Sequence, residues 1–217
     1  MMLNNAATLQ LETGSKFLNF TEIKDSKTFP AGVRRYVDLK NAPEKSLGEQ
    51  SGQFVCEGPE AVRLLLSSEV LIESLLLKRS AFQRLKTAIE ERLLRTPSNQ
   101  FQVFVSPDQR NFTETVGYQA RGALACGFVP RGHDFGWLRT QLQTRKTFRI
   151  LAVDGSNNPS NVGNLIRTAA ALEVDAVLLS EDCCDAWYRR SVRVSMGCCF
   201  ALPIVRCDLP TALKELG

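Results

Sequence analysis

The sequence lacks most features that mark membrane, secreted and metal-binding proteins. No apolar run approaches the ~18 residues needed to cross a membrane. The N-terminus has no basic start followed by an apolar block, so neither a secretory signal nor a membrane partner is predicted. The seven cysteines include no Cys-x-x-Cys pair, and His133 is the only histidine. Structural zinc sites use ligands in paired short spacings, so we predict no metal site.

Several nucleotide-binding and hydrolytic motifs are also missing. Neither G-x-G-x-x-G nor G-x-x-x-x-G-K-[ST] occurs, which disfavours a dinucleotide-binding fold and a nucleotide triphosphatase. No G-x-S-x-G turn supports a hydrolase. The cysteine pattern favours an intracellular chain with reduced thiols. No arginine precedes Arg34, which argues against a transit peptide, but cytoplasm, mitochondrion and plastid all remain open.

What is present has the composition of a globular protein. The chain has 217 residues, of which 44% are hydrophobic and 23% charged, with a net charge of +4. These values exclude a wholly disordered or fibrous chain. The length suits one large domain or two small ones. The mild basic excess permits an acidic partner such as nucleic acid without demonstrating one.

The pattern divides the chain into a leader, a first unit, a linker and a second unit. Residues 1–50 are polar and irregular, which predicts a mostly flexible leader. Residues 51–130 alternate strand and helix signals and predict an α/β unit. Residues 131–146 are a polar stretch that predicts a linker, with some helix over 135–142. Residues 147–217 begin a second α/β unit.

The second unit predicts a ligand site at one edge of a parallel sheet. A strand over 149–153 is followed by a helix from about 160 to 172 and a strand over 174–179. A β-α-β unit of this length implies parallel strands with a right-handed crossover. Ligands in such sheets bind at the carboxyl ends of the strands, where the loop 154–160 lies.

The helix after this loop carries a candidate functional arginine. The apolar residues of the helix form one face, and Arg167 lies roughly 160° from its centre at ~100° per residue. Small or polar residues, including Gly163 and Asn164, surround Arg167, so a polyanion could approach it. The asparagine-rich loop lies at a helix N-terminus, which favours anionic groups. The alternative is an ordinary solvated arginine.

A second cluster combines arginines with aromatic residues. Arg189, Arg190 and Arg193 fall within five residues and follow Trp187 and Tyr188. Arginine side chains contact phosphates, and aromatic rings stack on bases. A charged helix face, paired with the nearby acidic residues Glu181, Asp182 and Asp185, explains the pattern equally well.

Two stretches resemble signature motifs of one enzyme family. Residues 158–169 (NPSNVGNLIRTA) closely resemble the first motif of the SpoU (TrmH) family of RNA ribose 2′-O-methyltransferases. Residues 193–204 (RVSMGCCFALPI) resemble a later motif, in the right order and at the right separation. The unit at 53–129 is similar to the substrate-binding domain that precedes the catalytic domain in many members.

The resemblance implies a fold, a reaction and roles for particular residues. The expected fold is an N-terminal α/β substrate-binding domain followed by a parallel α/β knot (SPOUT) methyltransferase domain. Members transfer a methyl group from S-adenosylmethionine to a ribose 2′-hydroxyl of rRNA or tRNA, and full-length members form homodimers. Arg167 would act on the 2′-hydroxyl as a base or through an adjacent phosphate. A positioning role is equally compatible, because a guanidinium holds its proton strongly in water.

The other matching residues would support this chemistry. Asn161 would shape the loop and help to place the substrate, and it is assigned to the catalytic site with Arg167. Asp154, Ser160 and Gly163 would support the geometry of the motif. Arg189, Arg190 and Arg193 would contact RNA.

The chain departs from the family pattern in three places. Glu173 replaces the usual glycine after the helix and is expected to end it without a left-handed cap. Ala186 replaces a proline. The last two signatures, which in the family form the knot and bind most of the S-adenosylmethionine, do not occur before Gly217. We therefore expect a truncated methyltransferase domain whose cofactor-binding residues lie beyond Gly217. The alternative is a non-catalytic RNA-binding fragment.

Overall fold

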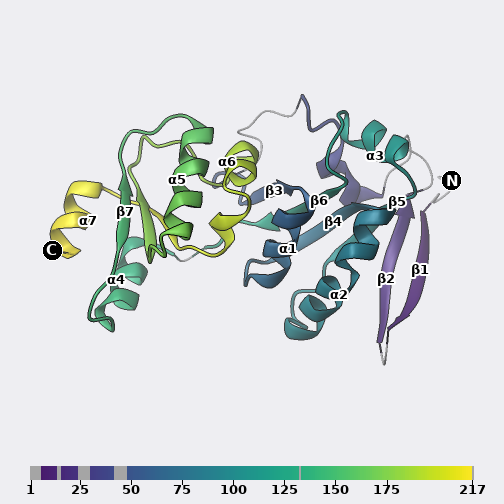
Figure 1. Ribbon diagram of the computed structural model, residues 1–217, viewed down its shortest axis with the longest axis horizontal. Helices are drawn as coiled ribbons and strands as arrows, with labels where there is room; N and C mark the ends of the chain where they lie inside the picture. Colours follow the sequence, from purple (N-terminus) through teal and green to yellow (C-terminus); the bar gives the residue numbers. More distant parts are fainter. Residues whose placement is uncertain (1–5, 14–15, 24–29, 42–47, 132, 217) are drawn as a thin grey trace.

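The computed structural model describes residues 6–13, 16–23, 30–41, 48–131 and 133–216. They form two layered α/β units that lie side by side (Figure 1). Each unit has its own sheet, with helices on both faces. The predicted α/β class is confirmed. None of the helices in the described segments is long and apolar enough to span a bilayer.

The first unit is built on a six-stranded mixed sheet in the order β1-β2-β5-β4-β6-β3. The β4–β5 and β2–β5 pairs are parallel, whereas β1–β2, β4–β6 and β3–β6 are antiparallel. The predicted alternation of strands and helices over 53–129 is confirmed in order and type. The strands are β1 Ala6–Thr13, β2 Lys16–Ile23, β3 Gln53–Glu57, β4 Ile72–Lys78, β5 Gln102–Ser106 and β6 Ala123–Phe128.

Helices cover both faces of this sheet because its strands are apolar on both sides. The helices α1 (Pro59–Ser67) and α2 (Arg79–Arg95) pack on one face, and their buried residues share a core with Phe54 of β3. The 3-10 helix η1 (Ala31–Tyr36) and α3 (Gln109–Val116) cover the other face. Neighbouring residues of β3 alternate between the two cores, as the period of a strand requires.

The expectation of a flexible leader over residues 1–50 is wrong for much of that range. β1 and β2 form an antiparallel hairpin, and β2 adds to the sheet beside β5. η1 follows, and its Tyr36 is fully buried. The Tyr36 hydroxyl donates to Ser74 O and accepts the Cys126 N–H, so it joins η1 to two central strands. Paired backbone and a buried tyrosine explain why these residues are ordered.

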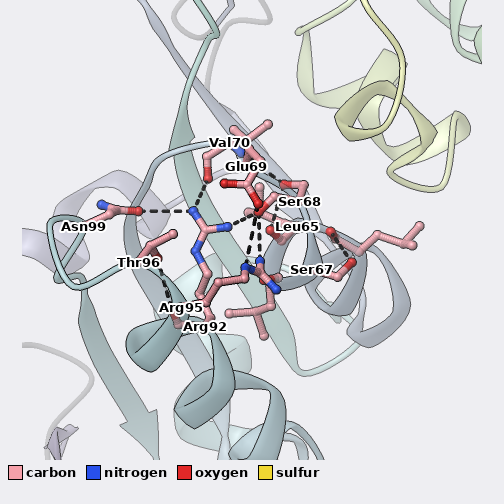
Figure 2. A network of polar contacts seen from close by, with 11 residues as sticks. Leu65, Ser67, Ser68, Glu69, Val70, Arg92, Arg95, Thr96 and Asn99 are labelled. Carbon is pink, nitrogen blue, oxygen red and sulfur yellow. Dashed lines mark hydrogen bonds and ion pairs between the residues drawn. The ribbon is translucent and has the colours of Figure 1, made fainter. Parts of the chain in front are cut away.

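A buried arginine fixes the connection between α1 and β4 (Figure 2). Arg92 of α2 has no exposed surface, and its guanidinium donates to the backbone oxygens of Ser68 and Val70. Arg95, one turn later, donates to Leu66 O at 2.9 Å. Burial lowers the pKa of Arg92. These donors satisfy carbonyl groups that the end of a helix leaves without intrahelical partners.

The second unit is a three-stranded parallel sheet in the order β7-β8-β9. The predicted parallel arrangement of its first two strands is confirmed. Helices α5 and α6 lie on one face and α4 and α7 on the other (Figure 1). The strands are β7 Ile150–Val153, β8 Ala176–Leu179 and β9 Ile204–Arg206. The helices are α4 Phe135–Gln143, α5 Pro159–Ala171, α6 Arg189–Val194 and α7 Leu209–Leu216, with a 3-10 turn η3 at Cys198–Phe200.

The predicted linker over 131–146 contains a helix that packs on the second sheet. α4 begins at the N-cap Asp134, whose carboxylate accepts the Trp137 N–H at 2.7 Å. Leu138 and Leu142 are buried beside β8 and β9. The helical part of this stretch therefore belongs to the core of the second unit.

Helix α5 ends in a way that differs from the expectation. Glu173 adopts a left-handed conformation with φ of 53°, although it is not a glycine. Its N–H donates to Ala170 O, and the next N–H, of Val174, donates to Ala169 O. This is the Schellman pattern that glycine usually supplies. The backbone geometry is kept, and the glutamate is held in it.

The two units share one apolar core. The edge strand β3 of the first sheet is covered by α6 of the second unit. The ring of Phe54 lies 5.1 Å from that of Trp187 and 5.2 Å from that of Phe200. Burying an edge strand under a helix removes a site for unwanted strand pairing. The junction is therefore a packed interface.

Candidate functional site

The predicted site lies at the carboxyl ends of β7, β8 and β9, where two loops are tied together. The N–H of Gly155, just after β7, donates to Ser180 Oγ at 2.9 Å. The same hydroxyl donates to Asp182 Oδ1 at 2.5 Å. Cys184 N–H donates to Ser156 O at 2.8 Å. These bonds hold the loop that leads into α5 against the loop that follows β8.

Helix α5 starts from a strong N-terminal signal. The side chain of Asn158 accepts the Ser160 N–H at 2.9 Å, and Pro159 occupies the first turn. Asn161 follows in the first turn and is exposed. Asp154, in the loop before the helix, is also exposed. The motif thus presents an amide and a carboxylate to solvent beside a helix N-terminus.

Gly163 makes a close helix contact that the sequence did not predict. It is buried against α6, and a Cβ atom there would lie 2.6 Å from Ser191 O and 2.9 Å from Val194 Cβ. The expected low, open surface around Gly163 is therefore wrong, because α6 fills it. A larger residue would force the two helices apart.

The contact with α6 sets the position of Arg167 and Ser160. Residues 160, 163 and 167 fall on one stripe of α5 by helical spacing. Ser160 Oγ accepts the Arg190 Nε–H at 2.8 Å, at one end of this stripe. Arg167 lies one turn beyond Gly163 and is exposed. An arginine therefore lies at each end of the stripe: Arg190 of α6 beside Ser160, and Arg167 of α5 itself.

The three arginines of α6 occupy different surroundings. Arg190 is exposed and bonded to Ser160, and Arg193 is exposed. Arg189 is half-buried and lies over the ring of Tyr118, with its guanidinium carbon 5.7 Å from the ring centroid. Among the ion pairs between described residues, none includes these three arginines. The expected alternative, pairing with Glu181, Asp182 and Asp185, is not found.

Two residues near the site were missed by the sequence analysis. Arg206 of β9 donates to the backbone oxygens of Ser180, Cys183 and other residues of the loop after β8. It also pairs with Glu49 of the first unit at 3.0 Å. Tyr118 is the second, and it belongs to the first unit. An isolated arginine in a strand and a tyrosine after a short helix carry no motif that would have identified them.

Comparison with known proteins finds one family that matches the second unit. The sequence profile described as the SpoU rRNA Methylase family matches residues 149–217. This range contains β7, the loop 154–160, α5 and α6. Residues 149–217 are therefore similar to the SpoU rRNA methylase family. We call this range the SpoU segment.

Some curated relatives match this chain over a short stretch. An uncharacterized tRNA/rRNA methyltransferase of Mycobacterium tuberculosis is 44% identical over 68 residues, which cover 31% of this chain and 24% of the relative. The 23S rRNA guanosine 2′-O-methyltransferase RlmP of Bacillus subtilis is 38% identical over 68 residues, covering 31% and 27%. The chain thus spans about a quarter of the length of these relatives.

A solved structure supports the same fold for both units together. The SpoU methyltransferase AviRb of Streptomyces viridochromogenes, solved in complex with AdoMet, superposes with a TM-score of 0.60 at 22% identity. The alignment covers 87% of this chain and 67% of that one. The first unit and the SpoU segment are thus combined here as in a known SpoU protein.

Proposed function

We propose that the chain acts in the transfer of a methyl group from S-adenosylmethionine to a ribose 2′-hydroxyl of rRNA or tRNA. The observation that carries the proposal is the SpoU motif on α5. Asn161 lies exposed in the first turn of α5, which follows the carboxyl end of β7, and Arg167 is exposed nearly two turns further along the helix. Ligands bind at the carboxyl ends of the strands in open α/β sheets. The name of the relative RlmP, a 2′-O-methyltransferase, supports the choice of the hydroxyl.

Arg167 is the residue we assign to the reacting hydroxyl. Its exposed guanidinium can donate paired hydrogen bonds to the phosphate next to the target ribose. A phosphate held in this way can draw the proton from the 2′-hydroxyl as the methyl group is transferred. Asn161, two turns earlier on the helix, supplies an amide that can orient the ribose. Both side chains must be held at fixed positions relative to the ribose. The close contact between α5 and α6 at Gly163 holds their helix in place.

The described residues supply one feature that suits the cofactor. A cavity of about 490 Å³ lies at the carboxyl ends of the three strands, and its lining includes Asp154, Glu181, Asp182 and Asp208. S-adenosylmethionine carries a sulfonium and an ammonium group, and carboxylates stabilise positive charge nearby. When bound, the cofactor supplies the electrophilic methyl group. The protein residues bind and orient both reactants.

The RNA contacts that we propose are Arg189, Arg190 and Arg193 of α6. The described residues offer these guanidinium groups no carboxylate partners, so their charge is available to phosphates. Arg190 is held by Ser160 of the SpoU motif, which places an RNA contact beside the helix that carries Arg167. The residues that bind RNA and the residue that acts on the ribose would thus lie on two helices that contact each other, α6 and α5.

The test measures methyl transfer and RNA affinity separately. Tritiated S-adenosylmethionine is incubated with the chain and rRNA, and the labelled RNA is then treated with alkali. A 2′-O-methyl group blocks alkaline cleavage of the neighbouring phosphodiester, whereas a methylated base does not. The Arg167→Ala change should lower transfer at least about 100-fold and change RNA affinity little.

The matched control is Arg139→Ala on α4, which removes an exposed arginine from a helix on the opposite face of the second sheet. This variant should keep the wild-type rate. Full transfer by Arg167→Ala would contradict the role of Arg167. A wild-type chain that gives no alkali-resistant labelled product would contradict the proposed reaction.

A further inference from the structure

Tyr118 of the first unit and Arg189 of the SpoU segment form a contact across the junction. The guanidinium carbon of Arg189 lies 5.7 Å from the centroid of the Tyr118 ring, within the range of a cation–π interaction. The Tyr118 hydroxyl donates to Glu57 Oε2 at 2.8 Å, at the end of β3. The first unit therefore holds the Tyr118 ring through the bond to Glu57, and the face of the ring contacts the Arg189 guanidinium of the SpoU segment.

Arg189 is poised to bind an anion at this place. Its Nη1 atom is buried and has no hydrogen-bond partner among the described residues. A buried donor left unpaired is unfavourable, and phosphate oxygens are natural partners for a guanidinium. The stacking on Tyr118 restricts the side chain, so less conformational freedom is lost when a phosphate binds.

Charges of both signs act on the hydroxyl of the same ring. Burial raises the pKa of the Tyr118 hydroxyl, and the negative charge of Glu57 acts in the same direction. The charges of Arg189 and Arg193 oppose this shift of the Tyr118 pKa, so both guanidinium groups act on the hydroxyl. Glu57 is the hydrogen-bond partner that balances part of their charge.

Further basic side chains stand beside this point in the first unit. The Arg121 stem passes close to Gly58, which follows Glu57, and Lys78 lies against Gly122. Gly58 N–H donates to Ala123 O, so these residues meet where β3 and β4 end and β6 begins. Two basic side chains of the first unit therefore lie at the end of β3 that carries Glu57.

We propose that Tyr118 is a positioning residue that holds Arg189 as a phosphate-binding group, so that one RNA phosphate site is shared between the first unit and the SpoU segment. This inference rests on the proposed function, because it assumes that RNA is the ligand. It adds a residue outside the SpoU segment.

A double-mutant cycle on RNA affinity tests the proposal. The probe is a fluorescently labelled RNA hairpin, titrated with the full chain at several salt concentrations. Arg189→Gln should weaken binding and reduce the salt slope by about 0.7–0.9, as expected for one lost phosphate contact. Tyr118→Leu should weaken binding roughly three- to tenfold. It should have no further effect when Arg189 is already replaced.

Two controls separate positioning from stability. Tyr118→Phe keeps the aromatic face and should retain the wild-type affinity and salt slope. Arg139→Gln removes an equal charge elsewhere and should leave the affinity and the salt slope nearly unchanged. Thermal unfolding of each variant shows whether the fold is intact. If the leucine variant is unstable, Tyr118→Gln replaces it, because the position is half-buried and accepts a polar side chain.

The outcomes distinguish this inference from the proposed function. If the effects of Tyr118→Leu and Arg189→Gln multiply, the two residues act independently and the shared site is wrong. The shared site is also wrong if Tyr118→Phe binds RNA as weakly as Tyr118→Leu. Loss of the hydrogen bond to Glu57 would then explain the lower affinity. A wild-type chain that does not bind the hairpin would contradict the RNA function itself.

Discussion

At the scale of single residues, Asp185 is a buried carboxyl group at the junction of the two units. It is 7% exposed and accepts the N–H groups of Glu49 at 2.5 Å and Trp187 at 2.7 Å. Burial, and then the charge of Glu49, raise the pKa of Asp185 to about 6. The two N–H groups and Arg206 act in the opposite direction and do not compensate. Asp185 is therefore held in a place that disfavours its charge.

This raised pKa predicts a stability that falls as the pH rises. In the unfolded chain an aspartate has a pKa near ~3.9. Between that value and about 6 the folded state binds more protons than the unfolded state, so the free energy of unfolding decreases with pH. Relative to Asp185→Asn, the wild type should lose up to about 2–3 kcal/mol as the pH rises through this window. Urea unfolding of both chains at several pH values measures the difference.

Asp182→Asn is the matched control for this experiment. Its carboxylate is exposed, and the Ser180 hydroxyl lowers the pKa of Asp182. Protonation of Asp182 therefore occurs below the window in which Asp185 titrates. Between pH 4 and pH 6, the free energy of unfolding of the wild type should not decrease relative to that of Asp182→Asn. If the difference in unfolding free energy between the wild type and Asp185→Asn also does not change with pH, the raised pKa of Asp185 is contradicted.

At the scale of secondary-structure elements, the C-terminus of α5 stores a strained residue. Glu173 takes a left-handed conformation that a glycine adopts without a steric penalty. Its carboxylate lies 3.9 Å from Arg149, but both side chains are largely exposed, so this pair contributes little. Replacing Glu173 by glycine should therefore stabilise the chain by roughly 0.5–1 kcal/mol.

Chemical denaturation of Glu173→Gly and Glu173→Ala tests this point. The alanine variant removes the same charge and keeps the Cβ atom, so it should not gain stability. Equal stability of both variants would show that charge, and not backbone strain, decides the effect. The helix and its Arg167 should be unchanged in either variant, because the cap lies beyond the motif.

The elements that sequence predicted best are those with a strong hydrophobic period or a capping signal. α5 and the parallel strands β7 and β8 agree with prediction to within a few residues. The hairpin of β1 and β2 was missed, although residues 8–12 alternate polar and apolar side chains. The many polar residues and glycines around it favoured a flexible leader instead. Pairing with β5, which is distant in sequence, decides its order.

The candidate site was predictable only where a motif carried it. Asn161 and Arg167 follow from the loop and helix that contain them, and the structure leaves both exposed. The contacts of Gly163 with α6 and of Tyr118 with Arg189 depend on tertiary packing, which no local motif predicts. Assignment of the catalytic and RNA-binding roles to these residues stays a prediction until the variants are measured.

At the scale of the whole molecule, the two units should unfold together. They share the core in which Phe54 of β3 contacts the rings of Trp187 and Phe200. Arg206 and Glu49 add a charged link across the same junction. Contacts of this kind make the stability of each unit depend on the other, as in one cooperative domain.

The two tryptophans allow this cooperativity to be measured at two places. Trp137 lies in α4 and packs against the core of the second unit, and Trp187 lies at the junction. Trp137→Phe and Trp187→Phe each leave one fluorescent reporter. In the wild-type core, the transition reported by Trp187 should coincide with the loss of helical circular dichroism. An earlier change at Trp187 would show that the junction opens before the units unfold.

Phe54→Ala supplies the decisive comparison in the chain that keeps Trp187. Removing this fully buried ring should destabilise the chain by about 3–5 kcal/mol. Because the lost contacts belong to the junction, the change at Trp187 should now precede the unfolding of both sheets. Phe112→Ala removes an equally buried ring from the other core of the first unit, so it should lower stability without separating the two transitions. Identical behaviour of the two variants would mean that the junction does not couple the units.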